Sequence, residues 1–403
     1  MNYINRSLAE VVRRASGSFK CVLLSGPRQV GKTTLLRTLA DSKRREVTLD
    51  DPAARSLARR DPDLFLATYP PPILIDEVQY APELFPFIKM RVDKSEAVGQ
   101  YWLTGSQPFH LMKNVSESLA GRVAVLHLQG LTEAERAGRP DRPFVPRFEE
   151  VRESALDSRA RIAEVMFRGS FPQLAAVPET DVGLYMSSYV ATYLARDVRD
   201  LVKATHEHEF LTFLSCLAAR TGQLLNANNL AQDVGLSAPT IRNWISILES
   251  SGVVHLLRPY QNNLTKRATA TPKVYFTDTG LASYLCGYRS AEELERSPIF
   301  GHLFENWTIM AVLKSWWHAG MTCEASFYRD KEGHEIDLLI RDAMRLYPLE
   351  IKVGANPDAS EIMANIQALK STGTKLESGA VLCLARTNQP ISRDLHRIPV
   401  GII

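Results

Sequence analysis

The chain has 403 residues, 45% hydrophobic and 23% charged, which is typical of soluble globular proteins and excludes a fibrous or disordered one. Its 48 Lys and Arg against 45 Asp and Glu leave a net charge of +3, too small to attract the whole molecule to nucleic acid, so any basic surface has to be local. Five scattered cysteines form no CxxC pair, and no apolar run reaches the roughly 18 residues of a membrane span. We therefore expect a cytoplasmic protein of two to four domains without a disulfide framework, a thiolate zinc site or a membrane partner.

Short apolar runs alternate with helical patterns in the first half of the chain, which predicts an α/β fold with a parallel sheet. The strands are expected at 19–25, 46–49, 73–75, 101–104 and 123–128. A proline-rich stretch at 138–146 predicts a linker. The pattern then predicts a multidomain protein. Its units are an α/β core (1–137), a helical lid (151–205), a helix-turn-helix unit (206–280) and a C-terminal α/β domain (298–403).

The first chemical signal is the pattern GxxxxGK[ST] at residues 26–33, placed between an apolar strand and a helical run. In this pattern glycines let backbone N–H groups surround a phosphate, the lysine reaches the β- and γ-oxygens, and the Thr33 hydroxyl can bind Mg²⁺. The N-terminus of the following helix adds a favourable partial charge. The pattern predicts a site for ATP and Mg²⁺. Its residues are Gly26, Pro27, Arg28, Gln29, Val30, Gly31, Lys32, Thr33 and Thr34.

A second strand, 73–75, ends in two carboxylates, Asp76 and Glu77. In an ATPase the strand next to the phosphate loop holds Mg²⁺ and positions water. We therefore expect Asp76 to be the acid on the metal side and Glu77 to be the base that orients the attacking water.

Further along, strand 101–103 is followed by Thr104 and Ser106, either of which can sense the γ-phosphate; an ordinary strand-end turn is the alternative. Arg122 stands just before the last strand of the core. It is expected to act as an arginine finger on a neighbouring subunit in a homo-oligomeric ring, or else to be a surface arginine.

Together with these elements the chain contains several longer motifs, spread over nearly its whole length. They are GPRQVGKTTL (26–35), ILIDEVQ (73–79), WLTGS (102–106), LAGR (119–122), FRGSFP (167–172), YLARD (193–197) and PKVYFTDTGL (272–281). In this combination the sequence resembles the bacterial and archaeal AAA+-type P-loop ATPases that carry a C-terminal domain of unknown function. The resemblance implies an ATPase core with sensor and finger residues. Ser170 departs from the pattern, since similar proteins generally have a second glycine there.

Residues 228–250 predict a helix-turn-helix, and the strands expected at 253–257 and 274–276 would complete a winged helix. The second helix is lightly charged, which makes it a poor DNA reader and a transcriptional regulator a weak hypothesis. The segment 258–277 carries no acid and several cations, which predicts contact with the DNA backbone. The expected DNA contacts are Arg242, Arg258, Lys266, Arg267 and Lys273. The alternative is a unit used only for subunit packing.

Near the C-terminus, Asp337 precedes a strand in which Glu350 and Lys352 share one face, and a helical Glu305 lies upstream. This order resembles the PD-(D/E)xK nucleases and implies a restriction-endonuclease-like domain. Asp337, Glu350 and Glu305 can then hold Mg²⁺ or Mn²⁺, and Lys352 can orient or deprotonate water. The alternative is a nuclease-like fold retained for DNA binding or assembly.

The residues thus predict a Mg²⁺-dependent ATPase that couples ATP binding and hydrolysis to DNA binding or remodelling, with metal-dependent DNA cleavage by the C-terminal domain. The alternative is an ATP-controlled DNA-binding switch or scaffold whose nuclease-like domain is catalytically silent. The intact set of Asp337, Glu350 and Lys352 favours the first hypothesis.

Overall fold

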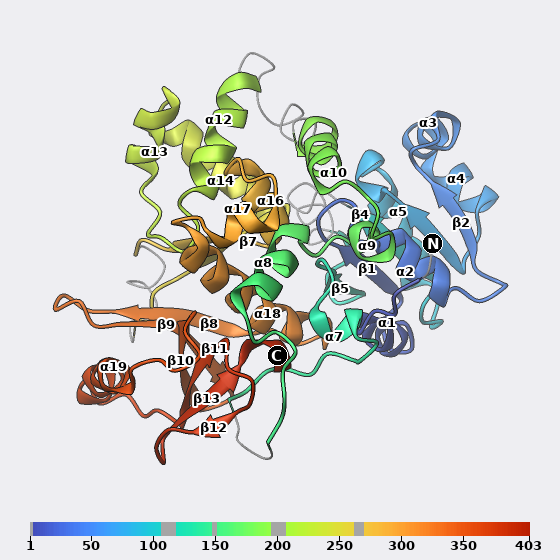
Figure 1. The fold of residues 1–403 in the computed structure, drawn as a ribbon. Helices are drawn as coiled ribbons and strands as arrows, with labels where there is room; N and C mark the ends of the chain where they lie inside the picture. Colours follow the sequence, from blue (N-terminus) through green and yellow to red (C-terminus); the bar gives the residue numbers. More distant parts are fainter. Residues whose placement is uncertain (1–2, 106–117, 147–150, 195–206, 262–269) are drawn as a thin grey trace.

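The structure is a computed structural model that describes the chain except residues 1–2, 106–117, 147–150, 195–206 and 262–269. Five parallel strands form the N-terminal sheet, in the order β2-β3-β4-β1-β5 (Figure 1). They are β1 (Cys21–Ser25), β2 (Arg45–Thr48), β3 (Ile73–Asp76), β4 (Tyr101–Gly105) and β5 (Val123–His127). The predicted parallel sheet is confirmed, and every strand ends within two residues of its expected bounds.

Helices pack on both faces of this sheet. They are α1 (Leu8–Ser16), α2 (Lys32–Leu39), α3 (Pro52–Arg60), α4 (Pro62–Thr68) and α5 (Leu84–Asp93), with a 3-10 turn, η1, at Val78–Tyr80. A short helix, α7 (Glu133–Arg136), follows β5. Along β1, Cys21 and Leu23 belong to one apolar cluster and Val22 and Leu24 to another, because successive side chains of a strand point to opposite faces. A strand buried on both faces is typical of a parallel sheet.

The middle of the chain is mainly helical. Its elements are α8 (Arg159–Arg168), α9 (Pro172–Ala176), α10 (Val182–Tyr189), η2 (Val190–Leu194), α12 (Glu207–Ala218), α13 (Ala227–Val234), α14 (Ala238–Ser250), β6 (Val254–Leu257), β7 (Lys273–Phe276), α16 (Thr279–Leu285) and α17 (Ala291–Glu295). The Asn226 side chain caps α13, Gly235 ends that helix with a φ of 77°, and Ser237 caps α14. Strands β6 and β7 pair antiparallel.

The C-terminal part contains a six-stranded sheet in the order β12-β13-β11-β10-β9-β8. Its elements are α18 (Phe300–His318), β8 (Glu324–Arg329), β9 (Glu335–Asp342), β10 (Arg345–Lys352), α19 (Ala359–Ser371), β11 (Gly379–Cys383), β12 (Gln389–Pro390), β13 (Leu395–Pro399) and η3 (Val400–Ile402). Strands β8, β9 and β10 form an antiparallel meander, and β11 joins β10 in parallel after the crossover helix α19.

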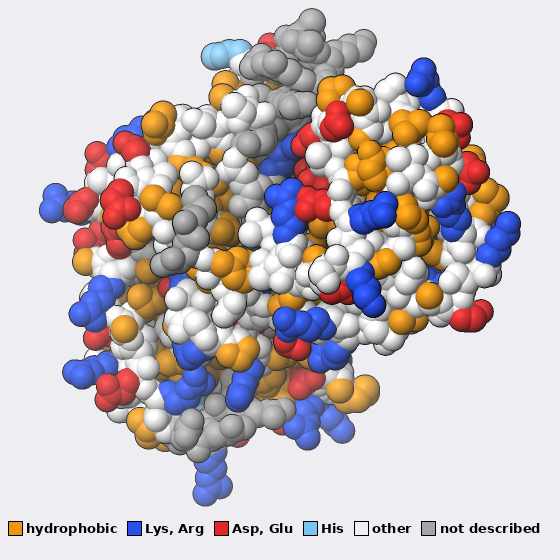
Figure 2. All heavy atoms as spheres, turned by 90° about the vertical axis from the view of Figure 1, so that its right-hand side faces the viewer, with side chains coloured by type: hydrophobic (Ala, Val, Ile, Leu, Met, Phe, Trp, Pro, Cys, Tyr) orange, Lys and Arg blue, Asp and Glu red, His pale blue; other side chains and the backbone are white. Residues whose placement is uncertain are grey.

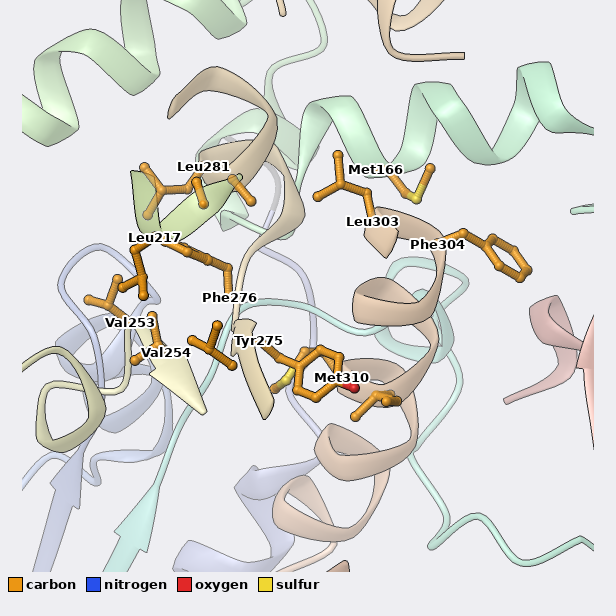
Figure 3. Close-up of a cluster of buried hydrophobic side chains, with 14 of the residues drawn as sticks. Met166, Leu217, Val253, Val254, Tyr275, Phe276, Leu281, Leu303, Phe304 and Met310 are labelled. Atoms are coloured by element: carbon orange, nitrogen blue, oxygen red, sulfur yellow. The ribbon is translucent and has the colours of Figure 1, made fainter. Parts of the chain in front are cut away.

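One apolar cluster extends from the middle helices into the C-terminal sheet. Figure 3 shows part of it, with Met166 of α8, Leu217 of α12 and Leu281 of α16 near Leu303 and Met310 of α18. The lid, the helix-turn-helix and the C-terminal domain, which the sequence predicts as separate units, therefore share a core. Within the described ranges, no helix combines the length and the apolar character needed to cross a membrane.

Candidate active site

The phosphate loop, residues 26–33, joins the central strand β1 to α2. Gly26 has a φ of 142°, and a Cβ there would lie 2.0 Å from the carbonyl oxygen of Leu128. Gly31 has a φ of 91° at the N-cap of α2. Both positions therefore require glycine, which is the physical reason for the spacing of the motif.

Lys32, the first residue of α2, is 6% exposed. Its Nζ donates hydrogen bonds to the carbonyl oxygens of Gly26 (2.9 Å) and Pro27 (2.7 Å). The ammonium group thus lies against the loop that the sequence predicts to surround a phosphate. Neutral carbonyls hold it, and a phosphate oxygen is a stronger acceptor for a charged donor.

Three predicted residues, one from α2 and two from the ends of neighbouring strands, meet beside the phosphate loop. Thr33 Oγ1 donates to Asp76 Oδ1 at 2.7 Å, and the buried Thr104 hydroxyl donates to the same oxygen. Because β4 lies between β1 and β3, Thr104 reaches Asp76 from the adjacent strand. A hydroxyl and a carboxylate oxygen of the kind that Mg²⁺ prefers are therefore held together beside the phosphate loop.

Glu77 follows β3 directly and has a φ of 55°, in the left-handed region that non-glycine residues rarely adopt. Its N–H donates to Thr104 Oγ1 at 3.1 Å, and Gln79 Nε2 donates to its Oε2. Such strained backbone persists where surrounding contacts hold it, commonly at functional sites. The Glu77 carboxylate is thus fixed one residue after Asp76, as a positioned base requires.

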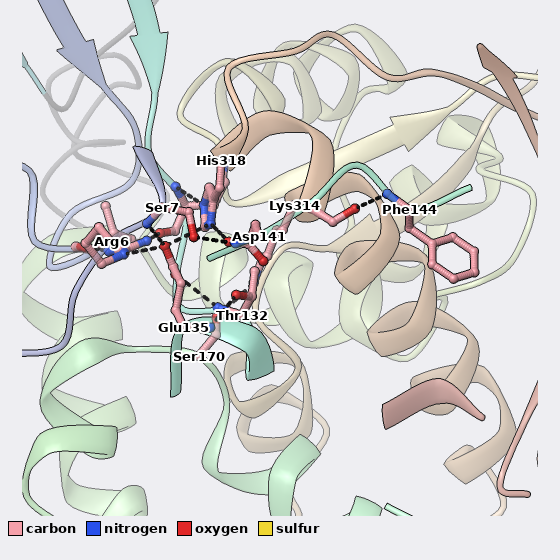
Figure 4. A network of polar contacts seen from close by, with 12 residues as sticks. Arg6, Ser7, Thr132, Glu135, Asp141, Phe144, Ser170, Lys314 and His318 are labelled. Carbon is pink, nitrogen blue, oxygen red and sulfur yellow. Dashed lines mark hydrogen bonds and ion pairs between the residues drawn. The ribbon is translucent and has the colours of Figure 1, made fainter. Parts of the chain in front are cut away.

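Sequence reasoning missed Arg6, a buried residue of the N-terminal segment. Its Nη1 donates to Val30 O (2.8 Å) in the phosphate loop and its Nη2 donates to Gln129 O (2.6 Å) just after β5. Its Nε lies 3.1 Å from Glu135 Oε1 (Figure 4). Arg6 therefore holds the backbone of the phosphate loop at Val30, and no sequence motif indicates this residue.

The Arg6–Glu135 pair continues into α18. His318 Nδ1 lies 3.4 Å from Glu135 Oε1 and 3.2 Å from Asp141 Oδ2, and all three side chains are buried (Figure 4). Burial alone would raise the pKa of Glu135, but the charges of His318 and Arg6 hold it down to about 2. This chain of contacts connects the phosphate loop with the long helix of the C-terminal part.

A second buried junction joins two of the longer motifs. Ser170 donates from its N–H (2.6 Å) and its hydroxyl (2.7 Å) to Asp278 Oδ2, and Lys314 Nζ of α18 donates to Ser170 Oγ at 3.0 Å. Burial lowers the pKa of Lys314 to about 8. A Cβ on Gly280 would lie 2.8 Å from the backbone nitrogen of Gly169, which explains why the two glycine-containing motifs fit together.

The lid also touches the phosphate loop. The hydroxyl of Tyr185 on α10 donates to Gln29 Oε1 in the loop. Gln29 has a φ of 62°. The helical lid predicted from the sequence thus contacts the nucleotide-site residues directly, through a tyrosine that no sequence signal marked.

The proposed arginine finger is engaged within its own chain. Arg122 Nη2 lies 3.0 Å from Asp93 Oδ2, its Nε also donates to this carboxylate, and its Nη1 donates to Ala120 O. The side chain lies apart from the Thr33–Asp76 site of the same chain, so a role in a neighbour's site stays a prediction. Ser106, the other sensor candidate, lies outside the described residues.

The described start of the segment predicted to contact DNA packs against the C-terminal sheet. Tyr260 N–H donates to Phe327 O at 2.6 Å, and Phe327 N–H donates to Arg258 O at 3.2 Å, so the chain after β6 extends along β8. Arg242 is exposed on α14. Lys266 and Arg267 lie outside the described residues. Figure 2 shows another part of the molecule, the face that looks to the right in Figure 1, where the N-terminal sheet and its helices lie; basic side chains there are interspersed with acidic and hydrophobic ones.

Lys273 corrects one of these predictions. It is 4% exposed, and its Nζ lies 2.5 Å from Glu335 Oε1 and 3.2 Å from Glu305 Oε1. Burial alone would lower its pKa, but the surrounding carboxylates raise it above the usual value. Lys273 and Tyr275 alternate on β7 and both point toward α18, where the Tyr275 hydroxyl donates to Glu305 Oε1 at 2.6 Å. A DNA backbone cannot reach this ammonium group.

The acidic residues predicted for the C-terminal domain lie close to one another. Asp337 Oδ2 accepts from Ile351 N–H at 2.8 Å, across the β9–β10 pair. Glu350 is 2% exposed, and burial together with the charge of Asp337 raises its pKa to about 9. Lys352 Nζ lies 3.6 Å from Glu350 Oε2 with its side chain 38% exposed. The predicted proximity of these three residues is thus present.

Glu305 does not complete a ligand triad. Burial and the charge of Asp337 raise its pKa to about 7, and its Oε1 is bound by Lys273 and Tyr275. In the described part of the chain, two other groups bring ligand atoms within 4.8 Å of one another. They are Glu135–Asp141–His318, which contacts Arg6, and Asp330–Glu332–His334. Among the described residues, the expected metal ligands Glu305, Asp337 and Glu350 are not such a group, because their ligand atoms do not all lie within 4.8 Å of one another.

The chain is similar to known protein families and to known proteins. A family profile described as an AAA domain matches residues 18–137, and two profiles described as domains of unknown function match 159–292 (DUF8612) and 300–403 (DUF4143). Uncharacterized proteins of Mycobacterium bovis and Mycobacterium tuberculosis are each 32% identical over 362 residues, 89% of this chain and 76% of each relative.

Two solved structures are also similar. The Walker-type ATPase of Pyrococcus abyssi has 14% identity and a TM-score of 0.44, with 70% of this chain and 96% of that chain covered. RuvB of Thermotoga maritima has 17% identity and a TM-score of 0.29, with coverages of 62% and 86%.

Proposed function

Since the chain belongs to the same family as the mycobacterial proteins and carries an AAA-type P-loop ATPase domain, we propose that it is a Mg²⁺-dependent ATPase whose nucleotide cycle switches the state of the remaining chain. The observation that carries this proposal is the contact of Thr33 and Thr104 with Asp76 beside Lys32. Hydroxyl, carboxylate and ammonium groups stand where a magnesium nucleotide needs them.

The residues divide the work as follows. Thr33 and Asp76 would hold Mg²⁺, and the bound ion supplies positive charge opposite the β- and γ-phosphates. Lys32 gives up its carbonyl acceptors and donates to phosphate oxygens. The Glu77 carboxylate, held in place by its fixed backbone, orients the attacking water and accepts a proton from it. Thr104 fixes Asp76 and Glu77 relative to each other, because its hydroxyl binds both residues.

The test is Glu77→Gln, which keeps the size and hydrogen bonding of the side chain but removes the base. ATP binding, measured by fluorescent-nucleotide titration, should persist while turnover is abolished. The exposed Glu83→Gln is the matched control, because Glu83 lies at the start of α5 without a side-chain cap. Unchanged turnover in Glu77→Gln would remove this residue from the mechanism.

The switch is proposed to act through two contacts with the loop. Arg6 connects Val30 to Glu135 and thereby to His318 on α18, and Tyr185 connects Gln29 to the lid. A phosphate that changes the loop backbone changes the acceptors of both side chains. Hydrogen exchange at α18, compared with and without a slowly hydrolysed ATP analogue, tests this coupling; identical exchange in both states would contradict it.

DNA binding or remodelling is the proposed output. It is supported by the arrangement of α13, α14, β6 and β7, which fits a winged helix, and by the exposed Arg242. Removing Lys266 and Arg267 together should weaken DNA binding and lower its salt dependence by about two units of slope. Lys273 is left intact in this test, because its loss would break buried ion pairs. A steep salt dependence that survives the double substitution would exclude Lys266 and Arg267 as the DNA contact.

The second candidate is an ATP-controlled scaffold whose nuclease-like C-terminal domain is silent. The order α18, β8–β9–β10, α19, β11 and the neighbouring Asp337, Glu350 and Lys352 support the nuclease-like relationship. The Lys273–Glu305 contact favours silence, because it occupies a predicted metal ligand. Labelled single-stranded, duplex and branched DNA incubated with Mg²⁺ or Mn²⁺, beside Lys352→Ala, separates the candidates. Cleavage lost in that variant would establish a nuclease.

A further inference from the structure

The acidic centre of the C-terminal part is built from four carboxylates. Glu305 comes from α18, Glu335 and Asp337 come from β9, and Glu350 comes from β10. Each of them interacts electrostatically with another member of the set or with a lysine beside it. The raised pKa values of Glu350 (about 9) and Glu305 (about 7) reduce the negative charge of this mostly buried centre at neutral pH, and the charge that is left needs a compensating cation.

Lys352 lies 3.6 Å from Glu350 Oε2 and Arg329 lies 3.4 Å from Glu335 Oε2, and a further, buried cation reaches this centre from another part of the chain. Lys273 lies on β7, in the unit predicted to be a wing, and its Nζ lies between Glu335 (2.5 Å) and Glu305 (3.2 Å). The ring of Phe327 lies 5.5 Å from the ammonium group, at a distance suitable for a cation–π contact. Tyr275 fills the neighbouring position and donates to the same Glu305 oxygen.

These groups do not fit a divalent metal that is bound in the usual way. Mg²⁺ needs several oxygen ligands at about 2.0–2.1 Å in octahedral geometry. Here Glu305 Oε1 already accepts from Lys273 and Tyr275, and the ammonium group would lie beside any ion placed between Glu305 and Asp337. A second positive charge at that distance is unfavourable in a buried site.

We propose that the ammonium group of Lys273 takes the place of a divalent cation in this centre, so that the centre binds no metal while β7 is packed against α18. The same contact fastens the helix-turn-helix unit to the C-terminal sheet. The motif PKVYF at 272–276 thereby acquires a function: its alternating Lys273 and Tyr275 are the two side chains that reach Glu305.

This inference rests on the second candidate function, the silent C-terminal domain, and it is independent of ATP hydrolysis. A chain that fails to hydrolyse ATP would contradict the ATPase proposal and leave the Lys273 proposal unaffected. A chain that hydrolyses ATP and also binds metal at Asp337 would support the ATPase proposal and contradict the Lys273 proposal.

The test is a titration of the full chain with Mn²⁺ in the absence of nucleotide, followed by the electron paramagnetic resonance signal of the free ion. The samples are the unaltered chain, Lys273→Ala, Lys273→Gln, and Lys273→Ala combined with Asp337→Asn. Lys331→Ala, at an exposed lysine of the β8–β9 turn, is the matched control. Lys273→Gln retains a hydrogen-bond donor to Glu305 and serves if the alanine variant does not fold.

We expect no Mn²⁺ bound at this centre in the unaltered chain and in Lys331→Ala. Removing the Lys273 charge should create one Mn²⁺ site, with an affinity at least ten-fold higher than that of the same centre in the unaltered chain. Adding Asp337→Asn should remove this site again. Stoichiometric Mn²⁺ binding by the unaltered chain that is lost in Asp337→Asn would overturn the proposal. A folded Lys273 variant without a new site would overturn it as well, because another cause would then keep the metal out.

Discussion

Two buried lysines of this chain, Lys32 and Lys273, were both predicted to contact phosphate groups, and their surroundings differ in kind. They are 6% and 4% exposed. Lys32 donates to two carbonyl oxygens of its own loop, whereas Lys273 lies between two carboxylates from distant elements. A phosphate competes well with carbonyls for an ammonium group and poorly with buried carboxylates. The acceptor, more than exposure, therefore decides whether a lysine is available to a ligand.

The largest effect is expected from Lys273→Met. This change removes the buried cation that Glu305 and Glu335 share and leaves Glu335 only its outer pair with Arg329; breaking a buried ion pair from one side costs about 3–5 kcal/mol. The measurement is the free energy of unfolding in urea. Arg37→Met is the control, since Arg37 forms an exposed pair with Glu46 and should change stability by at most about 1 kcal/mol. Equal effects of the two variants would mean that Lys273 is not part of a buried network.

Lys32→Ala comes next and should affect function instead of stability. Loss of an ammonium group that stabilises phosphate charge lowers turnover by roughly 10²–10³-fold. The steady-state rate of phosphate release measures this change, and Lys43→Ala, at an exposed lysine shortly after α2, should leave the rate unaltered. If Lys32→Ala keeps full turnover, the distinction between the two lysines is lost.

Arg6 binds both kinds of acceptor, the carbonyl oxygens of Val30 and Gln129 and the carboxylate of Glu135. The carboxylate partner makes the stability of the folded chain depend on pH. Glu135, its carboxylate partner, has a pKa of about 2 against the ordinary 4.5. A pKa lowered on folding stabilises the folded chain above about pH 4.5, and this stability is lost as the pH falls from 4.5 to 2. The expected contribution is about 3 kcal/mol.

Acid unfolding followed by circular dichroism measures this contribution. Glu135→Gln should be less stable at neutral pH and should lose much of the dependence between pH 4.5 and 2. Glu10→Gln, on the exposed face of α1, provides the control. A Glu135→Gln variant that keeps the original acid profile would show that another carboxyl causes it.

These outcomes also explain which features the sequence could predict. The phosphate loop, β3 with Asp76 and Glu77, and the strand before Thr104 carry local signals, because a strand, a turn and a helix start are determined by neighbouring residues. Their relative placement followed from the parallel sheet, in which the carboxyl ends of strands meet at one edge.

The environment of Lys273 could not be predicted in the same way. A run of cations without acids suggested a basic surface, yet the acids that bind Lys273 lie on α18 and β9, 32 and 62 residues further along the chain. Arg6 is missed for the same reason, because its partners Val30, Gln129 and Glu135 are set by tertiary packing. The lid, the helix-turn-helix unit and the C-terminal domain were predicted as separate units, but they share one apolar core, which no local sequence pattern indicates.

The smallest effect is expected from Arg122→Ala. Arg122 is an exposed cation that its own chain already binds through Asp93, which favours the surface-arginine alternative over the arginine finger; that alternative predicts turnover per chain within about threefold of the unaltered chain. The rate is measured over a range of protein concentrations. A fall of 10³-fold or more would instead assign Arg122 to a neighbour's active site.

The contacts of Arg6 also have a consequence for the order in which the protein is made. Of three residues in this network, Arg6 leaves the ribosome first, its partner Glu135 follows much later, and His318 is translated last. At about 5–20 residues per second, tens of seconds separate the first of these residues from the last. The buried network behind the phosphate loop is thus completed only after translation has passed α18, so a nascent chain truncated before α18 lacks the His318 contacts with Glu135 and Asp141.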